Sequence, residues 1–158
     1  MQLALKEKKL SFRDKFTVWD GDGNDKYYVV GEVLSIGKKL HISDVNGDEV
    51  AAIHEKIISF KPKYQIYING EKVGEIAKDK SLLKPKYHVS GLNWSIKGDI
   101  AEHKYSIIKD KKTIVTLKKK RLSLSNSYVL DIENDADTIP ALTVVLAIDC
   151  VLAEEKGK

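Results

Sequence analysis

The densest group of residues with a clear binding chemistry is the basic run Lys118-Lys119-Lys120-Arg121, which follows the apolar segment TIVTL. Clustered cations attract phosphate and carboxylate groups, so this run is a candidate anion-binding site. The segment KPKY occurs at 61–64 and again at 84–87, and it would extend the same site if both copies stack on one rim. The candidate anion-binding residues are therefore Lys118, Lys119, Lys120, Arg121, Lys61, Lys63, Lys84 and Lys86.

Other interpretations of these basic segments stay open. Charges at a strand end keep a neighbouring apolar strand from aggregating, and the run at 118–121 could do only that. Tyrosine beside lysine, as in KPKY, could stack on the bases of a single-stranded nucleic acid, although strand packing would place the same tyrosines. Of the 27 basic residues only Arg13 and Arg121 are arginine, the side chain preferred for bidentate phosphate recognition.

Two acidic segments could bind a hard cation. Residues 20–24, DGDGN, begin like a calcium-binding loop, but Asp25 stands where that loop needs glycine and Gly31 where it needs glutamate. A hairpin loop is therefore predicted there. The segment ENDAD at 133–137 precedes an apolar run, where carboxylates favour the positive end of a helix dipole. A weak metal site at Asp135 and Asp137 is the alternative.

The remaining polar residues indicate no catalytic site. The four histidines are scattered without metal-ligand spacing, and no nucleophile–base pair or glycine-rich phosphate loop is legible. We therefore expect no catalytic residue and no cofactor. Cys150 is expected in the core, while Asp149, inside an apolar segment, needs waiting hydrogen-bond donors or a place at the mouth of a barrel.

That apolar segment, IPALTVVLAIDCVLA at 139–153, predicts a helix that is apolar on every face. Asp137 or Thr138 could cap it, and Pro140 suits the first turn. The segment is short for a membrane span, which needs roughly 20 apolar residues. The preceding chain must therefore surround the helix, and the sequence predicts a mainly β fold, a closed antiparallel β-barrel enclosing a C-terminal helix.

A repeat offset by 23 residues relates residues 47–68 to residues 70–91, and a weaker copy begins near Lys111. Each copy starts with a tight turn, at 45–49, 68–72 and 109–112, and Asn-Gly in the first two predicts type I′ geometry. Units of this length hold two strands but no helical crossover. The sheet should therefore be an antiparallel meander.

The composition sets the broad class. The 158 residues fit a single domain over 1–158, the net charge is +4, and one cysteine excludes an internal disulfide framework. The N-terminal segment lacks the apolar core of a signal peptide, so we expect a cytoplasmic location without a transmembrane span.

An ordered series of segments resembles the LURP-one-related family of bacterial type, within the tubby C-terminal-like superfamily that includes phospholipid scramblases. The similarity extends from about Leu5 to Glu155 and rests on FRDKFTV at 12–18, VVGEVLSIGKKLHISDVNG, IHEKIISFKPKYQIY, NWSIKGD at 93–99, HKYSI at 103–107 and LAID at 146–149. The resemblance implies a twelve-stranded closed barrel around a hydrophobic C-terminal helix. It also relates the segment at 135–137 to a scramblase region tied to proposed calcium binding.

The resulting functional hypothesis is a non-catalytic intracellular binding module. Its partner would be an anionic phospholipid headgroup, a protein or, less favoured, a nucleic acid. The alternative is a structural or protein-interaction scaffold with no small ligand.

Overall fold

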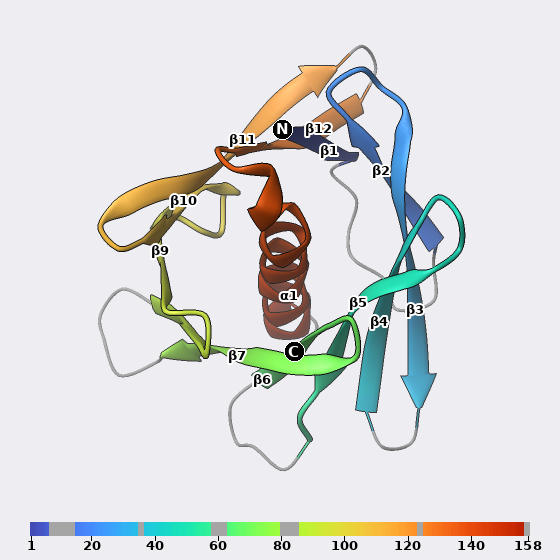
Figure 1. The fold of residues 1–158 in the computed structure, drawn as a ribbon. Coiled ribbons are helices and arrows are strands. Elements are labelled where there is room, and N and C mark those ends of the chain that lie inside the picture. The colour runs from blue at the N-terminus through green and yellow to red at the C-terminus, as the bar shows by residue number, and fades with distance from the viewer. Residues whose placement is uncertain (7–14, 35–36, 58–62, 80–85, 123–124, 157–158) are drawn as a thin grey trace.

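A computed structural model describes residues 1–6, 15–34, 37–57, 63–79, 86–122 and 125–156. It shows a closed barrel of twelve antiparallel strands around one C-terminal helix, as predicted (Figure 1). The strands are β1 (Gln2–Lys6), β2 (Lys15–Asp20), β3 (Asp25–Leu34), β4 (Gly37–Asp44), β5 (Glu49–Glu55), β6 (Lys63–Ile68), β7 (Glu71–Asp79), β8 (Lys86–Ser90), β9 (Trp94–Asp99), β10 (Lys104–Lys109), β11 (Lys112–Leu122) and β12 (Ser125–Ile132). Each strand pairs with its neighbours in sequence, and β1 pairs with β12 to close the barrel.

Alternation along each strand decides which side chains face the helix. In β1, Leu3 and Leu5 are buried, and in β6, Tyr64 and Ile66 are fully buried, while the residues between them point outward. Because successive side chains of a strand point to opposite faces, this pattern gives every strand an apolar inner face.

The hairpin turns agree only in part with the predicted geometry. Asn69 and Gly70 both have positive φ angles, 50° and 82°, as a type I′ turn requires. At Asn46-Gly47 only the glycine has a positive φ, 90°, so the type I′ prediction is wrong for this turn. The reason is Asp44, whose Oδ1 accepts hydrogen bonds from the backbone N–H groups of Asn46 and Asp48 and holds a wider loop.

The loop at 20–24 adopts the same geometry. Asp20 Oδ1 accepts hydrogen bonds from the N–H groups of Asp22 and Asn24, both at 2.9 Å. The loop joins β2 to β3, so the hairpin interpretation is confirmed. The Asp20 carboxylate of the calcium-like segment therefore stabilises the turn itself.

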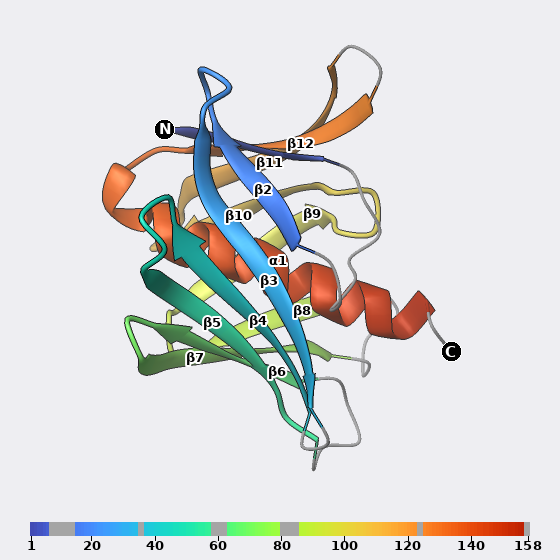
Figure 2. The ribbon, with the colours of Figure 1, turned by 90° about the vertical axis from the view of Figure 1, so that its right-hand side faces the viewer.

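Helix α1 (Thr138–Lys156) lies along the barrel axis, preceded by a 3₁₀ turn, η1 (Asp135–Asp137) (Figure 2). The 3₁₀ turn has its own cap: Asn134 accepts a hydrogen bond from the N–H of Ala136, and the Thr138 hydroxyl donates to the Asp135 carbonyl. The predicted caps of the helix, Asp137 and Thr138, lie where η1 meets α1. Cys150 is buried in the core, as expected.

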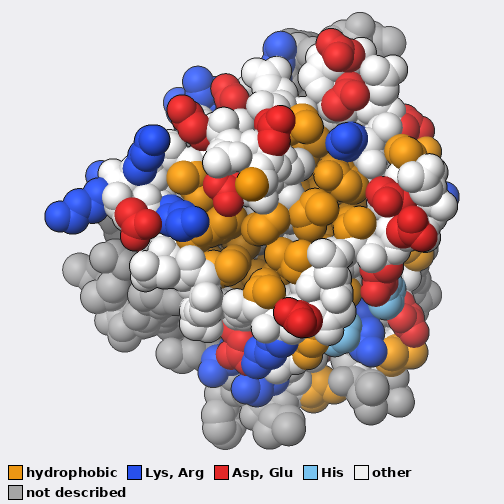
Figure 3. Space-filling view, viewed as in Figure 1, with side chains coloured by type: hydrophobic (Ala, Val, Ile, Leu, Met, Phe, Trp, Pro, Cys, Tyr) orange, Lys and Arg blue, Asp and Glu red, His pale blue; other side chains and the backbone are white. Residues whose placement is uncertain are grey.

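The barrel has two different mouths. The N-terminal mouth, where α1 begins, carries the tight turns; its centre is apolar and ringed by charged side chains (Figure 3). The C-terminal mouth, where α1 projects past the strands, carries the β9–β10 hairpin and the connections from β5 to β6 and from β7 to β8 (Figure 2). Residues 58–62 and 80–85, which include the first two residues of each KPKY segment, lie outside the described residues.

Residues 135–153 are long and apolar enough to cross a membrane by length and composition, but 67% of the most apolar window is buried inside the structure. The barrel supplies the apolar surroundings that this helix needs, so the structure indicates no transmembrane span.

We predict that a chain ending at Asp137 is unfolded or aggregated. Seven large aliphatic side chains of α1 are buried: Leu142, Val144, Val145, Leu146, Ile148, Val151 and Leu152. At about 1.5–3 kcal/mol each, their burial exceeds the typical net stability of about 5–15 kcal/mol. Circular dichroism and thermal melting test this expectation, and a soluble truncated chain that melts cooperatively would contradict it.

A matched pair of point variants separates this role from general sensitivity to truncation. Val144 is fully buried in α1, whereas Val33 on β3 is 51% exposed. Val144→Ala should lower the free energy of unfolding by about 2 kcal/mol, and Val33→Ala by less than about 1 kcal/mol. Urea denaturation measures both changes.

Candidate functional site

Five exposed lysines gather on the outer face of neighbouring strands at one side of the barrel. The buried residues of β9, β10, β11 and β1 alternate with Lys97, Lys104, Lys118, Lys120 and Lys6, so these lysines point away from the helix. We call them the lysine wall. Of the eight anion-binding candidates, Lys118 and Lys120 belong to it. The other three members come from strands that carry no basic run: Lys104 lies on β10 beside β11, and Lys97 and Lys6 lie one strand further away on β9 and β1.

Charge on the lysine wall is largely uncompensated. None of its five lysines forms an ion pair with any other residue that the structure describes. Tyr105 faces Leu117 across β10 and β11, and continuing this register places Lys104 opposite Lys118. Like charges directly opposite each other destabilise a sheet, and Asp99 on β9, opposite Lys104 on its other side, offsets part of this repulsion.

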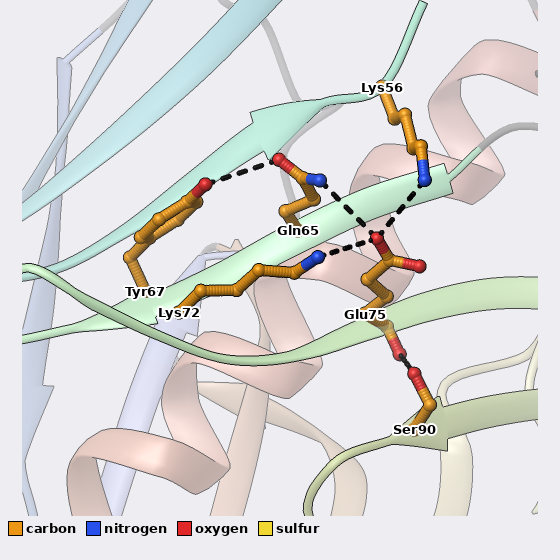
Figure 4. Close-up of polar contacts among 6 residues, drawn as sticks. All are labelled: Lys56, Gln65, Tyr67, Lys72, Glu75 and Ser90. Atoms are coloured by element: carbon orange, nitrogen blue, oxygen red, sulfur yellow. Dashed lines mark hydrogen bonds and ion pairs between the residues drawn. The ribbon is translucent and has the colours of Figure 1, made fainter. Parts of the chain in front are cut away.

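Lysines on the opposite side of the barrel are arranged differently. Lys72 and Lys56 lie 2.9 and 3.5 Å from the same oxygen of Glu75, which also accepts a hydrogen bond from Gln65 (Figure 4). Tyr67 donates to Gln65 and completes the network. The hydrogen bond from Lys72, aided by Gln65 and the charge of Lys56, lowers the pKa of Glu75 to about 2. Lys56 and Lys72 therefore form ion pairs on this side, whereas the lysine wall has none among the described residues.

The basic run does not act as one patch, because alternate side chains of a strand separate. Lys119 lies on the inward-facing side of β11, opposite Tyr128, and its Nζ is 3.7 Å from a carboxylate oxygen of Glu102 at the C-terminal mouth. Arg121 lies within β11, but its side chain is outside the described part.

The KPKY candidates lie at the same end of the barrel as the run but on another side. Lys63 begins β6, which four strands separate from β11, and Lys86 begins β8. Lys61 and Lys84 are outside the described residues. The structure therefore does not bring Lys63 beside the lysine wall.

The proposed metal residues Asp135 and Asp137 form η1 at the N-terminal mouth. Asp135 is exposed and lies 3.6 Å from the amino group of Met1. Within the described ranges no group of three or more His, Cys, Asp or Glu side chains is placed to hold a metal ion. Asp135 and Asp137 remain a prediction from sequence.

Asp149 has the partner that its sequence position demands. Nε2 of His103, from the β9–β10 hairpin, lies 3.0 Å from Asp149 Oδ1, and both side chains are mostly buried at the C-terminal mouth. The His103 ring stacks on Tyr128 with centroids 4.2 Å apart. The pair ties the end of α1 to the barrel wall, so both sequence expectations for Asp149 are met: a partner and a place at the mouth.

A second histidine bridges two carboxylates on the outer wall. Nε2 of His41 on β4 lies 2.8 Å from Glu32 on β3, and its Nδ1 contacts Glu49 on β5. Burial opposes the charged ring, but the hydrogen bonds to both glutamates outweigh it and raise the pKa of His41. Nearby His54 has a lowered pKa because of burial and the charges of Lys39 and His41. Sequence spacing gave no signal for these pairs, since the partners lie on different strands.

Known proteins share this architecture and its sequence pattern. The family described as LURP-one-related matches residues 1–149. The chain belongs to the LURP-one-related family. An uncharacterized protein of Bacillus subtilis (strain 168), YxjI, is 32% identical over 158 residues, covering 100% of this chain and 98% of that protein. The X-ray structure of a protein from Arabidopsis thaliana matches with a TM-score of 0.61 and 16% identity, covering 94% of this chain and 90% of that one. At this identity, the similarity to the Arabidopsis structure shows a shared fold only.

For this LURP-one-related barrel we predict a measurable coupling between His103 and Asp149. A double-mutant cycle with His103→Ala and Asp149→Ala should give an interaction energy of about 1–3 kcal/mol, because both groups are mostly buried. The control cycle uses the exposed Lys119–Glu102 pair, which should give less than about 1 kcal/mol. Equal coupling in both cycles, measured by urea denaturation, would contradict the anchoring role of His103.

The His41 bridge should make stability depend on pH in a defined direction. Its folded pKa lies above the reference value of 6.5, so its contribution is complete below pH 6.5 and is lost as the pH rises through the folded pKa. His41→Gln should therefore lower the free energy of unfolding more at pH 6 than at pH 9. His54→Gln is the control: its lowered pKa makes the native histidine unfavourable at low pH, so its effect on stability should have the opposite trend.

Proposed function

We propose that this LURP-one-related chain is a non-catalytic cytoplasmic binding module, a single domain over 1–158, whose lysine wall binds an anionic surface. The observation that carries the proposal is the contrast between two sides of one barrel. Lys56 and Lys72 share a carboxylate, whereas the five lysines of the wall have no carboxylate partner among the described residues. Water and salt screen these like charges in the free protein, and an external anionic surface would be attracted to them.

A membrane surface with anionic headgroups fits this wall best. The lysines spread over several strands instead of following one groove. A lysine ammonium is a point charge and lacks the planar guanidinium with which arginine binds one phosphate through two hydrogen bonds. Such a layout matches a diffuse negative surface, to which each nearby lysine contributes about 1 kcal/mol. Single-stranded nucleic acid, which binds through stacking platforms and a continuous basic channel, fits less well.

The test removes two wall lysines. Lys104→Gln/Lys118→Gln should weaken binding to vesicles of phosphatidylserine and phosphatidylcholine by about 30-fold, from about 1 kcal/mol per lysine. The dependence of binding on salt should also flatten, because fewer charges face the surface. The control, Lys56→Gln/Lys72→Gln, makes the same change in net charge on the compensated side and should bind nearly as the parent protein does. Vesicle co-sedimentation at two salt concentrations measures both.

Three results would contradict the proposal. Equal weakening by both double variants would mean that only net charge matters. Tighter binding to a single-stranded oligonucleotide than to vesicles would favour the nucleic-acid interpretation. No binding to either probe would favour a protein-interaction scaffold without a small ligand. The melting temperature of the wall variant should stay close to that of the parent, since exposed charges contribute little to stability.

A further inference from the structure

A hollow opens on the outer wall beside the short pairing of β1 with β2. Among the described residues, two pairs join these strands, Leu3 with Asp20 and Ala4 with Trp19. The hollow encloses about 380 Å³ and is lined by residues of β1, β2, β11, β12 and the β2–β3 turn. Its volume falls within the range of about 300–1,000 Å³ that small-molecule sites occupy. We call it the seam hollow.

The apolar part of the seam hollow follows from outward-facing residues of three strands. Val129 faces Ala4, and Ala4 faces Trp19, so the three side chains form one row across β12, β1 and β2. Alanine in the middle of this row leaves space that a larger side chain would fill. The register shifts between Val18 and Trp19 because Lys26 of β3 is an extra residue, a bulge beside the opening.

Opposite charges line the same hollow without meeting. Asp20 and Asp22 stand on the side of the β2–β3 turn, and Lys120 reaches the hollow from β11. No ion pair joins Lys120 to a carboxylate in the described part of the chain. Hydrogen bonds from the backbone of Asn24 and Asp22 lower the pKa of Asp20, so its carboxylate stays ionised at neutral pH.

We propose that the seam hollow binds a small zwitterion, with its ammonium group at Trp19, Asp20 and Asp22 and its anionic group at Lys120. Ammonium ions bind favourably to carboxylates and to the face of an indole ring, and tryptophan is the strongest aromatic partner for a cation. A lysine ammonium attracts a phosphate or carboxylate at the other end. The short apolar linker of such a ligand would lie on Ala4 and Val129. Phosphoethanolamine has this chemistry, either as a free molecule or as a lipid headgroup.

This inference does not depend on the proposed function, because it rests on the cavity and its two charged ends. The two sites share Lys120, so the tests use different residues. Substitutions of Lys104 and Lys118 test binding of an anionic surface by the lysine wall, and substitution of Lys120 tests ligand binding in the seam hollow. Lys118 and Lys120 are both exposed on the outer face of β11, but only Lys120 lines the hollow. Lys118→Gln is therefore the matched control for Lys120→Gln.

Isothermal titration calorimetry with phosphoethanolamine tests the proposal, and ethanolamine and inorganic phosphate serve as half-ligands. The zwitterion should bind at least about tenfold more tightly than either half, because each end adds a charge-assisted contact. Lys120→Gln should weaken phosphoethanolamine about tenfold, and Lys118→Gln by less than about twofold. Asp22→Asn should weaken phosphoethanolamine and leave inorganic phosphate unchanged. Ala4→Phe, which fills the hollow, should abolish binding.

Fluorescence gives a second readout that depends on position. The chain has two tryptophans, so a Trp94→Phe variant leaves Trp19 as the single emitter. Circular dichroism first checks that this variant has the native fold. Phosphoethanolamine should then shift the emission of Trp19. In the parent protein the same shift should be added to the emission of Trp94. Tighter binding to neutral vesicles with phosphatidylethanolamine than to the free headgroup would identify a lipid source. Tighter binding of the free molecule would identify a soluble one.

The proposal fails if inorganic phosphate binds as tightly as phosphoethanolamine, or if Lys118→Gln and Lys120→Gln have equal effects. It also fails if the parent protein binds no phosphoethanolamine at millimolar concentrations. The proposed function fails by a different result, namely unchanged binding of anionic vesicles by Lys104→Gln/Lys118→Gln. The two outcomes are therefore distinguishable.

Discussion

A helix without a polar face is the constraint on which this barrel depends. Because every side of α1 is apolar, no open sheet could cover it, and the strands must surround it completely. Closure requires that the first strand meets the last, and β1 does pair with β12. The apolar side chains on the inner face of the sheet then pack in the core around α1. Polar chemistry is left with the outer wall and the two mouths, which is where the lysine wall, the His41 bridge and the His103–Asp149 pair lie.

Features that depend on local pattern could be predicted from sequence, whereas those that depend on register could not. The apolar run at 139–153 and the short alternating segments are enough to predict the barrel and its helix. The basic run at 118–121 looks continuous in sequence, yet alternation turns Lys119 inward, away from its two neighbours. Lys104 joins the wall only through the pairing of β10 with β11. The sequence shows that Asp149 needs a hydrogen-bond partner. It does not show that this partner is His103, because their contact depends on how the β9–β10 hairpin packs against α1.

Both tryptophans lie in short strand pairings, Trp19 on the outer face beside Ala4 and Trp94 buried in the core beside Val89. Within the described ranges, the β1–β2 and β8–β9 seams each have two residue pairs in register, and Trp19 and Trp94 lie in those pairs. Each indole lines a cavity, of about 380 Å³ at β1–β2 and about 500 Å³ at β8–β9. Where a ladder is short, backbone hydrogen bonding ends early and side chains must cover the opening. A large aromatic ring does this and leaves residual space beside it, so weak seams and potential ligand sites coincide.

Because the first and last strands in the sequence close the barrel, folding cannot be completed until nearly the whole chain has been synthesised. The amino group of Met1 donates a hydrogen bond to the carbonyl of Ile132, 131 residues away, and α1 follows later still. Contacts of such long separation carry a large loop-closure entropy and form slowly. While α1 remains in the ribosome, the apolar faces of eleven or twelve strands have nothing to pack against. Chaperones that shield nascent chains should therefore matter more for this barrel than for a helical protein of equal length.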